Sequence, residues 1–167
     1  KGLALLLGPA GIGLLGHLTA LLTAASTVAQ MGLGAAGTRQ ISQAHASADR
    51  AEIALARRGL ILLSLVLAAF GGGAVWLLSE PLARYGLGNG ALQGAVAWLA
   101  LGVALSVAAL AQASLIQGMR RMWDLAVLQI GGALMLALIG LPLVWRFGEA
   151  AVPFYVVLTP LTAFVLG

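Results

Sequence analysis

Charge is what this sequence lacks most. Asp, Glu, Lys and Arg make up 8% of its residues, against about 25% in a typical soluble domain. Apolar residues make up 61%, and the mean hydropathy is +1.03. A soluble domain of this length could not build a charged surface from so few ionisable residues. The composition therefore predicts an all-α membrane protein that crosses the bilayer several times.

Residues that carry chemistry are also scarce. Cysteine is absent, which leaves the redox compartment undetermined. None of the five acids falls within a predicted span, so general acid–base catalysis inside the membrane has no obvious carrier. The two histidines, His17 and His45, are too isolated to suggest a metal site. We therefore expect no catalytic residue, no metal and no cofactor, and interpret Asp124 as a helix N-cap. The acids are Asp49, Glu52, Glu80, Asp124 and Glu149.

Apolar runs long enough to cross a membrane divide the chain, because a spanning helix needs about 20 apolar residues. We interpret residues 1–7 as the end of a truncated span, which Gly8-Pro9-Ala10-Gly11 interrupts. Pro153–Gly167 begins a span that the sequence does not finish. The chain is therefore expected to be a fragment, residues 1–167 forming one partial transmembrane domain. The predicted spans are Ile12 to about Thr38, Gly59–Ser79, Ala91–Gln117, Leu125–Trp145 and Pro153–Gly167.

The net charge of +4 indicates orientation rather than nucleic-acid binding, because the basic residues lie in short loops between apolar runs. Six arginines, namely Arg39, Arg50, Arg57, Arg58, Arg120 and Arg121, fall in two loops on one side of the predicted membrane. Arg84 and Arg146 fall on the other side. The positive-inside rule makes the first side cytoplasmic. Trp123 marks this inner face, whereas Trp76, Tyr85, Trp145, Phe147 and Tyr155 are expected at the outer face.

Two stretches match the dinucleotide-binding fingerprint G-x-G-x-x-G. They are Gly11-Ile-Gly13-Leu-Leu-Gly16 and Gly32-Leu-Gly34-Ala-Ala-Gly37. The fingerprint binds a nucleotide only between a strand and a helix of a βαβ unit, and here both stretches belong to a predicted membrane helix. Small residues in such a helix instead allow close packing or bending.

Polar residues form a stripe along the first complete span. At 100° per residue, Gly16, Thr19, Thr23, Ser26, Thr27, Gln30, Gly34 and Gly37 fall on one face. Leu14, Leu18, Leu21, Ala25 and Val28 fall on the opposite face. Such a stripe either packs against another helix through small residues and hydroxyls or lines a water-filled path. Thr19, Thr23 and Gln30 are therefore candidates for a substrate path.

Several motifs, in this order and spacing, resemble the bacterial polysaccharide (O-antigen-type) flippases of the multidrug/oligosaccharidyl-lipid/polysaccharide exporter superfamily. They are Leu7-Gly-Pro-Ala-Gly-Ile-Gly-Leu-Leu-Gly16, Met31-Gly-Leu-Gly-Ala-Ala-Gly-Thr-Arg-Gln-Ile41 and Gln117-Gly-Met-Arg-Arg121. Arg39 occupies the family's basic position after the second helix. Gln40 and Ile41 follow it where the family often has an aromatic residue.

The resemblance implies a helical bundle forming most of the first lobe of a two-lobed transporter, from the end of helix one to the start of helix six. It implies that the transporter flips an undecaprenyl-diphosphate-linked oligosaccharide across the bacterial inner membrane and is not an enzyme. Arg39 would then contact the substrate path, with Arg120 and Arg121 at its cytoplasmic mouth. The implied partners are the lipid-linked oligosaccharide, membrane lipids and the polysaccharide polymerase machinery, with no nucleic acid.

Two other functions stay open at this point. An ion-coupled exporter of drugs from the same superfamily would need an acid within a span, and the sequence places none there. A membrane polysaccharide polymerase or glycosyltransferase would need a large outer loop or carboxylates at the membrane edge, and the predicted outer loops are short.

Overall fold

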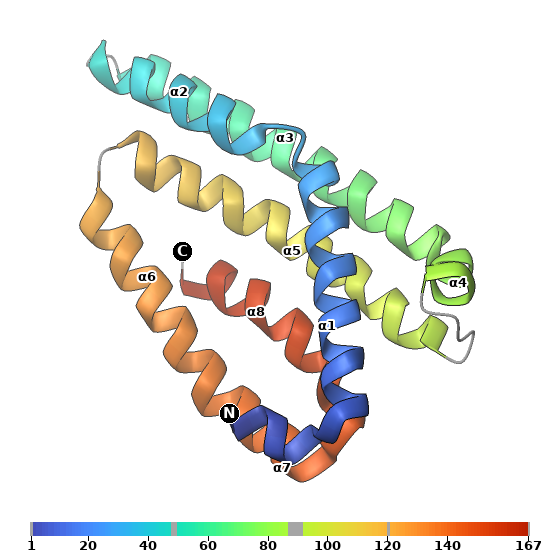
Figure 1. Ribbon diagram of the computed structural model, residues 1–167. Helices are drawn as coiled ribbons and strands as arrows, with labels where there is room; N and C mark the ends of the chain where they lie inside the picture. The colour runs from blue at the N-terminus through green and yellow to red at the C-terminus, as the bar shows by residue number, and fades with distance from the viewer. Residues whose placement is uncertain (1, 48–49, 87–91, 120, 167) are drawn as a thin grey trace.

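A computed structural model describes residues 2–47, 50–86, 92–119 and 121–166, and throughout these ranges the chain is a bundle of helices without a strand (Figure 1). Four helices, counted in the described part of the chain, are long and apolar enough to cross a membrane. The prediction of an all-α polytopic membrane protein is confirmed. The helices are α1 (Gly2–Gln30), α2 (Leu33–Ala46), α3 (Arg50–Leu77), α4 (Ser79–Pro81), α5 (Gln93–Gly118), α6 (Met122–Met135), α7 (Leu141–Phe147) and α8 (Val152–Leu166). Two π-helical turns, η1 (Leu82–Gly86) and η3 (Leu136–Gly140), and the 3₁₀ turn η4 (Gly148–Ala151) connect them.

The predicted helix from Ile12 to about Thr38 is divided in the structure. The helix α1 ends at Gln30 and α2 begins at Leu33. Met31 has φ 41° and Gly32 has φ 79°, so two successive residues leave the right-handed helical region. Glycine takes this left-handed conformation without steric penalty and commonly ends helices. Residues 33–38, expected to extend the span, instead open a separate helix.

Two other boundaries also differ from the sequence-based expectation. The predicted interruption at Gly8 is a bend within α1, because Gly8 has φ 65° and ψ −178° while helix continues on both sides. The helix α3 begins at Arg50 rather than at Gly59. The polar segment of residues 40–58 is therefore helical over most of its described length, shared between α2 and α3.

The helix α5 forms the centre of the packing. Val96, Leu99, Val103 and Val107 on α5 are fully buried, and α5 contacts α1, α2, α3 and α8. Small residues bring the neighbouring helices close. A Cβ added to Gly71 of α3 would lie 2.4 Å from the Cβ of Ala29 of α1. Such close backbone approach is typical of helix packing in membranes, where dispersion contacts replace a hydrophobic driving force.

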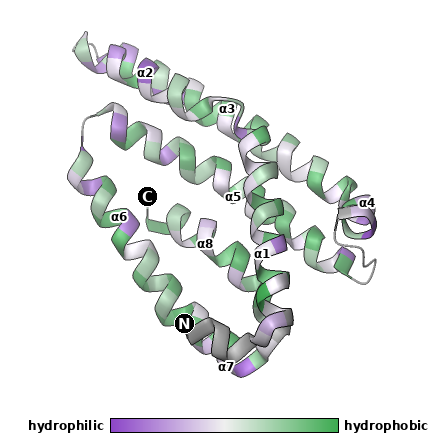
Figure 2. Ribbon diagram, in the orientation of Figure 1, coloured by the Kyte–Doolittle hydropathy of each residue, from purple (hydrophilic) through white to green (hydrophobic). Residues whose placement is uncertain are grey.

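Polar residues concentrate in α2 and at the ends of the bundle, near α4, near α7 and where α5 meets α6 (Figure 2). The connection from α2 to α3 and the connection from α5 to α6 lie at the same end of the bundle (Figure 1). Trp76, Trp123, Trp145 and Phe147 lie near helix ends and are exposed, as expected for aromatic residues at the membrane interfaces. Tyr155 differs, because it is half-buried near the start of α8.

Candidate substrate cavity

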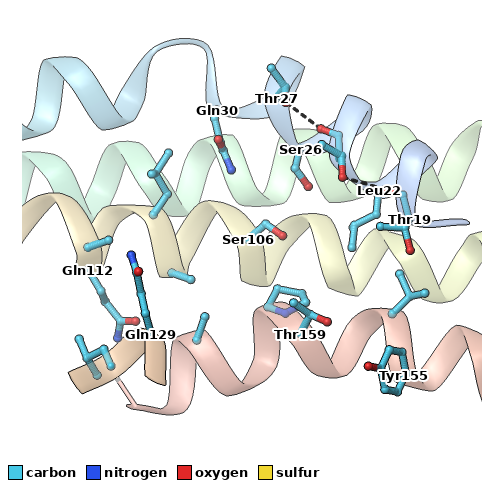
Figure 3. A pocket seen from close by; sticks show the side chains of 18 of the residues that line it. Thr19, Leu22, Ser26, Thr27, Gln30, Ser106, Gln112, Gln129, Tyr155 and Thr159 are labelled. Carbon is cyan, nitrogen blue, oxygen red and sulfur yellow. Dashed lines mark hydrogen bonds between the residues drawn. The ribbon is translucent and has the colours of Figure 1, made fainter. Parts of the chain in front are cut away.

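A cavity of about 670 Å³ opens between α1, α5, α6 and α8 (Figure 3). One face of α1 supplies half of its polar side chains, and one or two polar residues on each of the other three helices supply the rest. Leucine, valine, alanine and proline side chains form the remainder of the wall, together with the ring of Tyr155. The polar lining consists of Thr19, Thr23, Ser26, Thr27, Gln30, Ser106, Gln112, Gln129, Tyr155 and Thr159.

The described residues that line this cavity carry hydroxyl and amide groups but no ionisable acid, lysine, arginine or histidine. The cavity therefore carries hydrogen-bonding groups without a fixed charge, set in a mostly apolar wall. An uncharged hydrogen-bonding wall suits a neutral polar ligand, whereas a buried charge would need a partner or strong solvation. Pockets of about 300–1,000 Å³ are the usual size for small-molecule ligands, and this one falls within that range.

Several hydroxyl protons of the lining are engaged by the helix backbone. The Thr23 hydroxyl donates to the Thr19 carbonyl oxygen at 2.8 Å, and the Thr27 hydroxyl donates to the Thr23 carbonyl oxygen at 2.8 Å. On α5 the Ser106 hydroxyl donates to the Gly102 carbonyl oxygen at 2.8 Å. Such bonds to the preceding turn are how serine and threonine are accommodated within a helix. Each hydroxyl has one proton and two lone pairs, so these oxygens keep acceptor capacity.

Two further oxygens of the lining have no hydrogen-bond partner among the described residues. They are the Ser26 Oγ atom on α1 and the Gln112 Oε1 atom on α5. Ser26 is 7% exposed, and its side chain points from α1 into the cavity in Figure 3. Leaving a buried polar atom unsatisfied costs about 1–3 kcal/mol. These two atoms therefore mark places where a ligand or water would gain a hydrogen bond.

The predicted path residues Thr19, Thr23 and Gln30 are brought together at this cavity. Gly34 and Gly37, which the helical wheel put on the same stripe, lie beyond the break on α2 and pack against Leu110 and Leu60 instead. Leu18, assigned to the opposite face, is fully buried. The packed ridge of α1 therefore runs between the two predicted faces through Leu18, Leu22 and Ala29.

Sequence patterns did not reveal the far wall of the cavity. Ser106, Gln112, Gln129, Tyr155 and Thr159 come from three helices. Each is an isolated polar residue in an apolar helix, which is a signal for an inward position. Nothing in the linear sequence indicates which of them share one space.

A second cavity, of about 980 Å³, lies between the ends of α3, α5 and α6. Arg57 and Arg121 line it, with Trp123 and Asp124, and most of its wall is apolar. Arg121 Nε lies 2.5 Å from Asp124 Oδ2. The interpretation of Asp124 as an N-cap is wrong, because α6 begins at Met122 and Arg121 is its N-cap residue. Asp124 instead lies in the first turn of α6, where the helix dipole stabilises a carboxylate.

Two of the three arginines proposed for the substrate route are described, and they have different surroundings. Arg39 is exposed on α2 and lines neither cavity, whereas Arg121 lines the second one. Arg120 lies outside the described residues. Leu33, Gly37, Ile41 and Ala44 are the buried residues of α2, and Arg39 lies away from the face that they define.

Comparison with known proteins shows the family to which the chain belongs. A sequence model of the family described as "Polysaccharide biosynthesis protein" matches residues 2–167. The chain belongs to this polysaccharide biosynthesis family. Neither the curated proteins nor the solved structures include a significant match to it. The match covers every residue that lines the two cavities.

Both glycine fingerprints lie in helices. Residues 11–16 lie inside α1, and residues 32–37 open α2. No strand precedes either stretch in the described part of the chain, so the βαβ context that a dinucleotide site requires is missing. The described residues also contain no group of three or more histidine, cysteine or acidic side chains that could hold a metal ion.

Proposed function

We propose that this protein is a transporter that flips undecaprenyl-diphosphate-linked oligosaccharide across the bacterial inner membrane during polysaccharide export. The observation that carries the proposal is the cavity lined by uncharged hydroxyl and amide groups within a bundle of apolar helices. An oligosaccharide crossing a membrane needs hydrogen-bonding groups at membrane depth, since an unsatisfied polar group there costs several kcal/mol, on the order of 2–7. Membership of the polysaccharide biosynthesis family agrees with a glycan as cargo.

Transport without chemical change fits the lining of the cavity. Glycosyl transfer or hydrolysis commonly uses paired carboxylates, and the described lining has none. The bundle would then act as one lobe that moves against another, with its helices carrying the glycan rather than cleaving it. Working partners would be the enzymes that assemble the lipid-linked unit on the inside and the polymerase that consumes it outside.

Deleting the gene from its natural host tests the proposal directly. Surface polysaccharide should disappear, and lipid-linked oligosaccharide should accumulate on the cytoplasmic side of the inner membrane. Reintroducing the wild-type gene should restore both. Normal surface polysaccharide in the deletion strain, with greater sensitivity to toxic cations, would instead support the ion-coupled exporter.

Two variants of α1 link the function to the cavity. Thr23 lines the cavity, whereas Val28 does not and is 73% exposed. Thr23→Phe should reduce export about tenfold, which corresponds to a barrier raised by about 1.4 kcal/mol, because the ring fills polar space that the glycan needs. Val28→Phe should leave export within about twofold of wild type, because an exposed apolar residue is replaced by another. The measurement is surface polysaccharide at equal membrane levels of the protein. Equal effects of the two variants would show that the glycan does not pass through the cavity.

A further inference from the structure

We infer that the cavity between α1, α5, α6 and α8 binds the sugar portion of the substrate through hydrogen bonds with its hydroxyl and amide groups, and that it does not bind the diphosphate. The inference rests on the proposed function and adds to it the chemical part of the substrate that this site takes.

The first argument is the direction of the hydrogen bonds in the wall. The hydroxyl protons of Thr23, Thr27 and Ser106 already point to carbonyl oxygens of their own helices. What these groups present to the cavity is lone pairs. The amide N–H groups of Gln30, Gln112 and Gln129 add donors to these acceptors, so the wall can both donate and accept hydrogen bonds without carrying a charge. A sugar hydroxyl, which can donate as well as accept, is complementary to such a wall.

The second argument is the pair of unpartnered side-chain oxygens. Ser26 Oγ and Gln112 Oε1 lie on different helices, line the same cavity and have no partner among the described residues. Ser26 is more than nine-tenths buried. Free protein can satisfy these atoms only with water or by rotating the side chains. Two or more ligand donors reaching both helices would satisfy them at once, which favours a molecule with several hydroxyl groups over a single small ion.

The third argument is the position of the positive charge. The described lining of the cavity has no arginine or lysine, whereas Arg57 and Arg121 line the second cavity at the end where α5 meets α6. Phosphate binding in proteins relies on such charged donors. Gln112 and Leu128 line both cavities, so the uncharged site and the charged end are neighbours in one half of the bundle. A diphosphate placed in the uncharged cavity would lose its solvation without gaining a countercharge.

Cysteine protection tests the inference in membrane vesicles from the natural host. The 167-residue sequence has no cysteine, so Ser26→Cys places a single thiol in it at the cavity wall. The thiol should react with a small, water-soluble methanethiosulfonate reagent. Lipid-linked oligosaccharide extracted from the host, added at about ten times its Kd, should slow the reaction about tenfold by mass action. The glycan released from that lipid by mild acid should also protect, at higher concentration.

Two companion variants make the result specific. Ser106→Cys on α5 faces the same cavity and should show the same protection, which keeps the test decisive if Ser26→Cys does not insert. Tyr85→Cys lies outside both cavities at a site that is 90% exposed and should react equally with and without glycan.

Other outcomes would overturn the inference. Equal protection by undecaprenyl diphosphate without sugar would assign the cavity to the diphosphate or the lipid chain, and protection by sodium ions alone would make it a cation site. Thiols at Ser26 and Ser106 that never react, or that react regardless of glycan, would show that the cavity is closed or unused. If the deletion strain still lost surface polysaccharide in these cases, the proposed function would stand while the sugar site would not.

Discussion

Arg39 shows how far one residue's position depends on packing. It lies on α2, away from the face formed by Leu33, Gly37, Ile41 and Ala44. Its guanidinium forms no ion pair with the described residues. Its carbonyl oxygen accepts a hydrogen bond from the Ser42 hydroxyl at 2.9 Å. An exposed guanidinium beside an apolar bundle is well placed for anionic lipid headgroups. Contact between Arg39 and the substrate path, which the family resemblance implies, stays a prediction.

The two roles of Arg39 give different outcomes in the natural host. If the side chain binds headgroups, Arg39→Lys should be silent and Arg39→Ala should keep most activity, because Arg50, Arg57 and Arg58 supply charge at the same end. We expect this result from the exposed position. Loss of surface polysaccharide in Arg39→Ala at normal membrane levels, with partial activity for Arg39→Lys, would place Arg39 on the substrate route. Surface polysaccharide and membrane protein levels are the measurements.

At the scale of helices, three consecutive glycines on α3 differ sharply in what surrounds them. A Cβ at Gly72 would lie 2.9 Å from the carbonyl oxygen of Ala100 on α5, whereas a Cβ at Gly73 would meet no atom within 4 Å. The close approach of α3 to α5 therefore requires a residue without a side chain at position 72. At position 73 a small side chain would fit without displacing a neighbour.

The same substitution at these two neighbours should have opposite effects on stability. Gly72→Ala should destabilise the bundle by about 1–3 kcal/mol, because the methyl group meets backbone that cannot rotate away. Gly73→Ala should be neutral or stabilise by up to about 1 kcal/mol, since alanine has the higher helix propensity. Thermal unfolding of the two variants in detergent provides the comparison. A matching loss of stability in both would mean that α3 and α5 do not approach closely at Gly72.

For the whole molecule, the split of the arginines predicts which end of the bundle faces the cytoplasm. Four of the six inner arginines lie on the described parts of α2 and α3, and Arg121 precedes α6. The end of α2 and the start of α3 lie at the same end of the bundle as the start of α6 (Figure 1). Arg84 and Arg146 lie in η1 and α7, away from that end. Placing that end inside keeps the larger positive charge on the cytoplasmic side.

Labelling in intact cells tests this orientation with two exposed positions. His45→Cys on α2 should be protected from a membrane-impermeant maleimide, and Tyr85→Cys in η1 should react with it. Both positions are exposed in the structure, so burial does not confound the comparison. Permeabilised cells should label at both sites. Reaction of His45→Cys alone in intact cells would invert the topology.

The sequence by itself determined the class of the protein and the grouping of polar side chains along α1. Low charge and long apolar runs require helices in a membrane, because only internally hydrogen-bonded segments are stable there. The 100° periodicity that grouped Thr19, Thr23 and Gln30 is a local property of a helix, and it held as far as α1 continued.

Tertiary structure decided what periodicity could not. The break at Met31 and Gly32 depends on two left-handed residues, and it separated Gly34 and Gly37 from the polar stripe that an unbroken helix would have continued. The far wall of the cavity came from α5, α6 and α8, whose distance along the chain from α1 gives no hint of their proximity. Whether an isolated polar side chain packs or lines a cavity depends on which helix lies opposite, and only the assembled bundle fixes that.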